Sequence, residues 1–112
     1  MKVTYIVNAL GEGGTERSLA DLLPGLRDGG VDISIITLRS RGDEGVEPLL
    51  RAQGFEIHTI GSIGRLKTLR ALRRQIRVQQ PDIVHTMLFE ANLYGRLATI
   101  TTGARVVVSL VN

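Results

Sequence analysis

Five short apolar runs alternate with helical patterns along the 112 residues, and this alternation predicts an α/β fold. The first run, at residues 2–8, is nearly continuous and rich in β-branched residues, which is typical of a strand buried on both faces of a parallel sheet. A glycine-rich turn and a row of leucines follow it. Because crossovers between parallel strands are right-handed, we expect a Rossmann-like, doubly wound sheet of about five strands in the order 3-2-1-4-5.

Periodicity and turn residues place the other elements. Strands are expected at residues 32–38, 55–60, 82–86 and 105–111, and the strand at 55–60 is short and polar enough to lie near an edge. The first helix is expected from Gly14 or Thr15 to the Gly29-Gly30 pair, and further helices at residues 46–52, 65–80 and 90–102. Pro81 should stop the helix at 65–80 and hold Gln80 in an extended conformation.

Two of these helices carry apolar rows that predict their buried faces. The row of the first helix is Leu19, Leu22, Leu23 and Leu26. The row of the helix at 65–80 is Leu66, Leu69, Leu72, Arg73 and Ile76, in which Arg73 must extend its charged end to solvent. Pro24 lies within the first row and predicts a kink or a lost hydrogen bond.

The composition excludes several classes of protein. With 43% hydrophobic residues and few aromatic ones, the chain can bury an aliphatic core as a single domain. The absence of cysteine removes disulfides, thiolate metal sites and thiol catalysis, and it fits a reducing compartment. No signal-peptide cleavage site follows the N-terminus, and no apolar stretch approaches the roughly 20 residues of a membrane span. We therefore expect a cytoplasmic protein that is at most peripheral at the inner membrane face.

Positive charge is concentrated in the helix expected at residues 65–80. No acidic residue occurs between Ile57 and Pro81, and the rest of the chain has eight basic against eleven acidic residues. The six basic residues of this helix are Arg65, Lys67, Arg70, Arg73, Arg74 and Arg77. The helix has three interpretations: a solvated outer face, attraction to an anionic membrane surface or lipid-linked phosphate, and nucleic-acid binding. No aromatic platform accompanies the charge, so we expect no nucleic acid partner.

The turn between the first strand and the first helix is the main candidate for a binding site. Gly11, Gly13 and Gly14 precede a helix N-terminus, where backbone N–H groups lack partners within the helix and the dipole attracts anions. A dinucleotide-binding turn needs G-x-G-x-x-G and an acid at the end of the second strand, and neither is present, so an NAD-type oxidoreductase is disfavoured. A P-loop is also absent. A phosphate-binding turn and a tight turn that binds nothing both stay open.

Two stretches resemble landmarks of the family 4 glycosyltransferases of the GT-B fold. The run Gly13-Gly14-Thr15-Glu16-Arg17 looks like the Gly-Gly-x-Glu-Arg element that follows the first strand in that family. Residues 81–98, which begin Pro-Asp-Ile-Val-His-Thr, resemble a second landmark. Both stand at their proper places in the order of elements, so the resemblance covers the chain from end to end.

The resemblance implies a metal-independent, retaining enzyme with two Rossmann-like domains and an active site between them. The N-terminal domain, to which this chain corresponds, mainly binds the acceptor, and the C-terminal domain holds the nucleotide sugar, with no cofactor beyond this donor. By the resemblance, the backbone of Gly13 and Gly14, flanked by Glu12 and Thr15, would contact the donor phosphate. The opposite wall would be lined by His85, Met87, Phe89, Glu90 and Asn92, of which Met87, Phe89 and Asn92 would lie on the acceptor side.

The chain departs from the family pattern on that wall. Many relatives carry His-x-His at the end of the fourth strand, whereas this sequence has His85 and then Met87 in the place of the second His. Glu90 stands where some relatives have His, and Val111 where a His often precedes Asn112. The catalytic residues are therefore unassigned, and His85 and Glu90 are weak candidates. His85 has a second interpretation, in which it is packed in the strand and has no catalytic role.

The interpretation that follows is the N-terminal part of a retaining glycosyltransferase that moves a sugar from a nucleotide-sugar donor to a hydroxyl acceptor, on a polysaccharide or a lipid. Because the nucleotide-sugar domain lies outside the 112 residues, we expect no transfer by this chain alone. The alternative is a stand-alone domain that binds a phosphorylated ligand or a partner without catalysis. An uncovered edge strand as apolar as residues 106–108 predicts dimerisation or poor solubility, which a monomer in sedimentation at high concentration would contradict.

Overall fold

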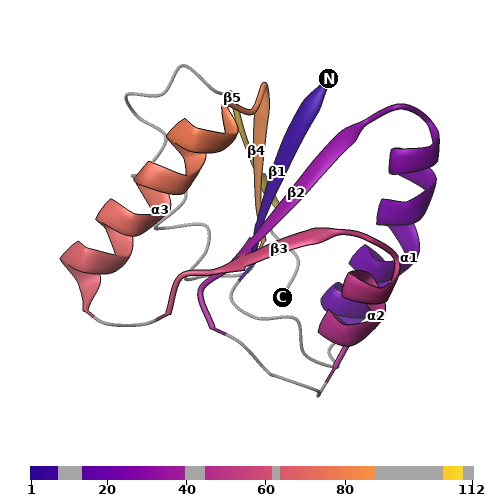
Figure 1. Cartoon of the computed structure of the whole chain (residues 1–112), viewed down its shortest axis with the longest axis horizontal. Coiled ribbons are helices and arrows are strands. Elements are labelled where there is room, and N and C mark those ends of the chain that lie inside the picture. Colours follow the sequence, from indigo (N-terminus) through magenta and orange to yellow (C-terminus); the bar gives the residue numbers. More distant parts are fainter. Residues whose placement is uncertain (8–13, 40–44, 62–63, 88–104, 110–112) are drawn as a thin grey trace.

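A five-stranded, all-parallel sheet forms the centre of the protein (Figure 1). The computed structural model describes residues 1–7, 14–39, 45–61, 64–87 and 105–109. The strands are β1 (Lys2–Val7), β2 (Asp32–Thr37), β3 (Glu56–Thr59), β4 (Ile83–Met87) and β5 (Arg105–Ser109), in the order β3-β2-β1-β4-β5. The predicted fold class and strand order are confirmed, including the edge position of the short third strand. β5 forms the other edge, and the association expected through it stays a prediction.

Helices cover both faces of this sheet and make a three-layer arrangement. They are α1 (Gly14–Asp28), α2 (Glu47–Ala52) and α3 (Arg65–Gln79). Figure 1 shows α1 and α2 on one side of the strands and α3 on the other, as right-handed crossovers on either side of β1 require. The helix expected at residues 90–102 lies outside the described residues.

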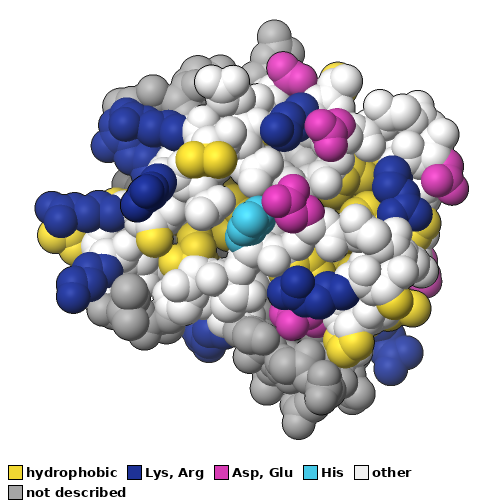
Figure 2. Space-filling view, viewed as in Figure 1, with side chains coloured by type: hydrophobic (Ala, Val, Ile, Leu, Met, Phe, Trp, Pro, Cys, Tyr) yellow, Lys and Arg dark blue, Asp and Glu magenta, His cyan; other side chains and the backbone are white. Residues whose placement is uncertain are grey.

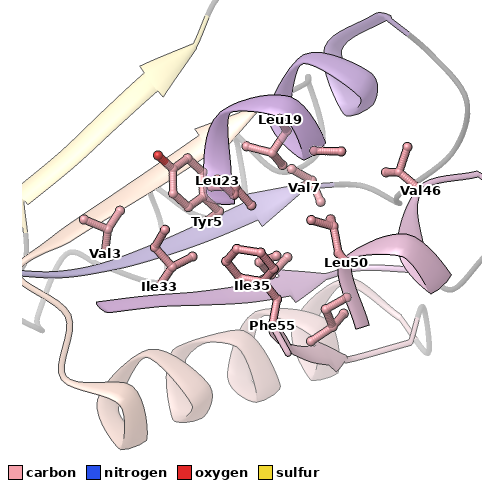
Figure 3. Packing of buried hydrophobic residues seen from close by; sticks show 12 residues of the cluster. Val3, Tyr5, Val7, Leu19, Leu23, Ile33, Ile35, Val46, Leu50 and Phe55 are labelled. Carbon is pink, nitrogen blue, oxygen red and sulfur yellow. The ribbon is translucent and has the colours of Figure 1, made fainter. Parts of the chain in front are cut away.

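The larger hydrophobic core lies between the sheet and the α1–α2 side, and we call it the α1-side core (Figure 3). Tyr5 and Val7 of β1 and Ile35 of β2 point towards Leu19 and Leu23 of α1. Val46, Leu50 and Phe55 close the same core around α2. The side chains are aliphatic apart from Tyr5 and Phe55, as the composition predicted.

The opposite face of the sheet packs on α3 in a smaller core. It contains Ile6, Ile36 and Val84 from three neighbouring strands, and Leu72 and Ile76 from α3, all with no exposed surface. Because successive residues of a strand point to opposite faces, Tyr5 serves one core and Ile6 the other. This is why the central strands have nearly continuous apolar sequences.

Two pairs of hydroxyl groups satisfy polar side chains inside the sheet. The Thr4 and Ser34 hydroxyls lie 2.8 Å apart on adjacent strands β1 and β2, and both residues are buried. Thr37 and Thr59 form the same kind of contact, also at 2.8 Å, between β2 and β3. Each pair joins residues that are opposite in register, so these hydrogen bonds form without any displacement of the strands.

Two of the leucines predicted to be buried are exposed. Leu22 of α1 is 52% exposed and Leu66 of α3 is 63% exposed. In α1 the buried row follows Leu19 and Leu23, four residues apart, and Leu22 lies about 100° around the helix from Leu23. In α3 the buried row is Thr68, Leu72, Ile76 and Gln79, and Leu66 lies roughly a third of a turn away from it.

The ends of the helices agree with the predicted stops, with one correction. α1 continues through Pro24 and ends before Gly30, whose φ of +98° is accessible to glycine without strain. Gln80 is not extended as predicted: it has φ 49° and ψ 54°, the left-handed conformation, and its N–H donates to the Ile76 carbonyl at 2.9 Å. A left-handed residue also ends a helix before Pro81, because it caps a free carbonyl.

Arg27, near the C-terminal end of α1, contacts the turn between α2 and β3. Its guanidinium lies over the Phe55 ring, 4.4 Å from the centroid, and donates a hydrogen bond to the Gln53 carbonyl. A cation over an aromatic face is attracted by the ring quadrupole. The contact therefore holds two elements of the α1 side that no strand pairing joins.

A stack of Tyr5 and His85 connects β1 to β4. The two residues are opposite in register, and their rings are 5.0 Å apart between centroids with an angle of 28° between planes. Burial raises the pKa of Tyr5 above its ordinary value, since the phenolate would be poorly solvated. Burial lowers the pKa of His85 below its ordinary value for the same reason, because there the charged form is the imidazolium.

Replacing Leu23 with Ala should lower the free energy of unfolding by about 2 to 5 kcal/mol, because the fully buried side chain leaves a cavity in the α1-side core. Leu22→Ala, the same chemical change one position earlier on an exposed side chain, should cost less than about 1 kcal/mol. Urea denaturation of both variants measures the difference. Equal losses would contradict the packing of α1 described here.

Acidification should weaken the fold through His85. The folded-state pKa of His85 lies below the ordinary value, so as pH falls through about 6.5 the unfolded chain takes up a proton that the folded chain does not. Stability is therefore fully present above this pH and declines until the folded-state pKa is passed. His85→Phe keeps a ring against Tyr5 and removes the titration. Urea midpoints at a series of pH values should show a shallower acid decline for this variant, and identical slopes would refute the argument.

Candidate functional site

The candidate site lies at the carboxyl edge of the sheet, beside β1 and β4. These two strands are neighbours, and the crossovers that follow them leave in opposite directions along the sheet, because β2 lies beyond β1 and β5 beyond β4. In doubly wound sheets this topological switch point forms a crevice outside the carboxyl ends of the strands. Figure 1 shows that α1 begins at this edge, since it runs antiparallel to the strands it packs on.

The start of α1 is the part of the candidate site at which phosphate contacts were predicted. The helix begins at Gly14, so the N–H groups of its first turn have no carbonyl partner within the helix, and the positive end of its dipole lies there. Gly14 and Thr15 are the only two of the predicted phosphate contacts within the described residues, and both belong to this first turn. Glu12 and Gly13 lie outside the described residues.

The opposite wall begins at the end of β4. Met87 is the last residue of this strand and therefore lies at the same edge of the sheet as the end of β1. His85 lies two residues further inside, half-buried and stacked on Tyr5. Phe89, Glu90 and Asn92 lie outside the described residues. Of the predicted wall, the structure thus places His85 and Met87 on the strand next to β1.

A cluster of basic residues lies on a different element, on the outer side of α3. Arg70, Arg73, Arg74 and Arg77, all predicted from the sequence, line an open groove of about 410 Å³ together with Val78. Figure 2 shows Lys and Arg side chains gathered over α3, while the acidic side chains visible on that face lie over other elements. Val78 was not predicted as part of this cluster. Its place one residue after Arg77, outside the predicted apolar row, was the signal available in the sequence.

A small polar group around His58 was also missed by the sequence analysis. The imidazole Nε2 lies 2.9 Å from a Glu56 carboxylate oxygen on the same strand and 3.4 Å from the Gln79 amide nitrogen of α3. The alternation of strand residues puts Glu56 and His58 on one face of β3, the face that α3 covers. The period-two spacing of Glu56 and His58 could have predicted their contact, but the partner in α3 could not be read from the sequence.

Among the residues that the structure describes, no group of three or more His, Cys, Asp or Glu side chains is arranged to hold a metal ion. No helix within the described ranges is long and apolar enough to cross a membrane.

Comparison with known structures supports the fold. The chain superimposes on the apo form of a lipopolysaccharide outer core galactosyltransferase, WaaB, with a TM-score of 0.77 and 19% sequence identity. The match covers 96% of this chain but 32% of the galactosyltransferase chain, so the 112 residues span about a third of that protein's length. At this level of identity the similarity shows the fold, which is that of the Rossmann-like part of a GT-B protein.

Comparison at the level of sequence identifies the family. No curated protein matches the chain. The family described as "Glycosyl transferase 4-like domain" matches residues 13–111, which includes the start of α1, all of the described helices and four of the five strands. The chain therefore belongs to the glycosyltransferase 4-like domain family.

Proposed function

We propose that this chain is the acceptor-side, N-terminal part of a retaining glycosyltransferase that transfers a hexose from a nucleotide-sugar donor to a hydroxyl group. The observation that carries the proposal is the family match over residues 13–111, combined with a helix N-terminus at the switch point of the sheet. In the proposed acceptor, the hydroxyl belongs to a polysaccharide or a lipid-linked glycan. The name of the similar galactosyltransferase, which refers to lipopolysaccharide, supports this class of acceptor.

The proposed chemistry uses the start of α1 to stabilise the leaving group. Transfer breaks the bond between the anomeric carbon and the donor diphosphate, and it forms a bond from that carbon to the acceptor oxygen, while the acceptor hydroxyl gives up its proton to the departing diphosphate. Negative charge grows on the diphosphate as its bond breaks. Backbone N–H groups at Gly14 and Thr15, together with the helix dipole, are fixed donors for that charge, and fixed donors stabilise a transition state without reorganisation. Neither a metal nor a cofactor besides the donor is needed for this contribution.

The β4 side of the crevice would then face the reacting sugar and the acceptor. Met87 is the last residue of the strand, and His85 is held by its stack on Tyr5. The lowered pKa of His85 keeps its imidazole neutral at physiological pH. In the proposed enzyme we assign His85 to positioning of β4 and not to proton transfer, since its ring is engaged with Tyr5 inside the sheet face.

The 112 residues by themselves are proposed to be inactive in transfer. They correspond to 32% of the length of the similar galactosyltransferase. In the proposed enzyme, the domain that holds the nucleotide sugar is therefore formed by chain beyond these residues. Release of nucleoside diphosphate from a nucleotide sugar by the purified chain would contradict this. The absence of cysteine, together with the proposed use of nucleotide sugars, leads us to place the enzyme in the cytoplasm.

Uridine diphosphate should bind the purified chain weakly in calorimetry, while NAD should not bind. Gly14→Asp should weaken the uridine diphosphate affinity at least about tenfold, or about 1.4 kcal/mol, because it puts a carboxylate where the diphosphate is attracted. The same substitution should keep or raise the melting temperature, since Asp at a helix N-terminus is favourable.

Gly25→Asp is the matched control for this experiment. It makes the same change in charge and size near the other end of α1, where an added side chain meets nothing within 4 Å. Its affinity for uridine diphosphate should equal that of the unmodified chain. Equal affinity in both variants, or no binding of uridine diphosphate at all, would remove the anion site from the proposal.

A further inference from the structure

We propose that the outer face of α3 docks on an anionic membrane surface. This basic face consists of Arg70, Arg73, Arg74 and Arg77 around the groove, with Lys67, Leu66 and Val78 on the same side of the helix. Helical geometry brings these residues together, because the arginines are spaced three and four apart and Leu66 precedes Arg70 by one turn. The inference rests on this face alone and does not depend on the proposed sugar transfer.

The first argument is electrostatic. Arg70, Arg74 and Arg77 are exposed, and none of the three forms an ion pair with an acid among the residues that the structure describes. Like charges three or four residues apart on a helix repel one another, and α3 contains no acidic residue to offset this. An anionic surface would relieve the repulsion along the whole length of the helix.

The second argument is the presence of apolar side chains beside the charges. Leu66 is 63% exposed and Val78 is 68% exposed, and they flank the arginines near the two ends of α3. Figure 2 shows hydrophobic side chains at the surface among the Lys and Arg side chains over α3. Helices that lie on a membrane combine basic residues, which contact lipid phosphates, with apolar residues that enter the acyl boundary.

The third argument is the packing of α3 itself. Its inner row, Thr68, Leu72, Ile76 and Gln79, is buried against the sheet, so the helix stays folded while its outer face binds. Nucleic acid fits the same face less well, because the described lining of the groove is arginine and valine, with no aromatic ring on which a base could stack. The chemistry of the face therefore complements that of an anionic lipid headgroup layer.

Sedimentation of the full chain with vesicles tests the proposal. The chain should bind phosphatidylcholine vesicles that contain phosphatidylglycerol and should not bind vesicles of phosphatidylcholine alone. The variant R70Q/R74Q/R77Q should lose at least about tenfold in the partition coefficient, because each basic residue at an anionic surface contributes roughly fivefold. Arg73 is left in place because it is half-buried.

The matched control is K2Q/R17Q/R39Q, which removes the same net charge outside α3 and should change the partition coefficient by no more than about threefold. Equal losses in the two triple variants, or no binding to either vesicle, would overturn the proposal. The proposal would also be overturned if the chain bound double-stranded RNA as tightly as anionic vesicles and lost this binding in R70Q/R74Q/R77Q. Circular dichroism of each variant confirms that a loss of binding is not a loss of fold.

The apolar residues give a second measurement. Raising the salt concentration to 1 M shortens the Debye length to about 3 Å and should remove the electrostatic part of the binding. The part that resists salt should fall in L66S/V78S, whose exposed side chains contribute little to folding. A salt-resistant part that is unchanged in L66S/V78S would overturn the insertion of these residues.

Discussion

The constraint on which this structure depends is that every central strand must be covered on both faces. Residues 5 and 6 of β1 illustrate it: Tyr5 is buried against α1 and Ile6 against α3, although they are adjacent in the chain. A parallel sheet achieves this only if helices lie on both of its sides, which follows when right-handed crossovers leave the centre of the sheet in opposite directions. The order β3-β2-β1-β4-β5 follows from that requirement.

The same constraint positions the candidate site and the basic face. A helix that crosses back over a parallel sheet runs antiparallel to the strands, so α1 begins at their carboxyl edge, beside the ends of β1 and β4. The helix on the other side, α3, needs one apolar row to cover Ile6, Ile36 and Val84. The other side of α3 is not needed to cover the sheet, and in this protein it carries arginines. Site and basic face therefore occupy different elements of one scaffold.

Much of this arrangement was predictable from the sequence, because the signals are local or periodic. The apolar runs predicted the ends of all five strands to within two residues, and the positions of glycine and proline predicted where the helices end. The exposure of Leu22 and Leu66 was not predictable from spacing alone, since a helix has more apolar positions than the sheet can cover and tertiary packing selects among them. Gln80 was also mispredicted: a residue before proline at a helix end can be extended or left-handed, and here it is left-handed, with φ 49° and ψ 54°.

The candidate site was predicted less completely than the fold. The strand order on which its placement depends and the helix start at Gly14 were confirmed, because both follow from the order of elements. The stack of His85 on Tyr5 joins residues 80 positions apart, and only the register of β1 with β4 reveals it. Contacts of this kind depend on which strand lies next to which, and on the residue at which the pairing begins. A single sequence does not specify that residue.

The distribution of the two cores along the chain has a consequence for how the protein is made. The α1-side core uses residues 3 to 57, so it can assemble as soon as the first half of the chain has left the ribosome. The other core needs Leu72, Ile76 and Val84, and until these emerge Ile6 and Ile36 face water on an uncovered sheet. The backbone hydrogen bond from Lys2 to the Asp82 carboxylate spans 80 residues and forms among the last. The nascent protein therefore passes through a half-covered sheet, and the arrival of α3 covers the second face.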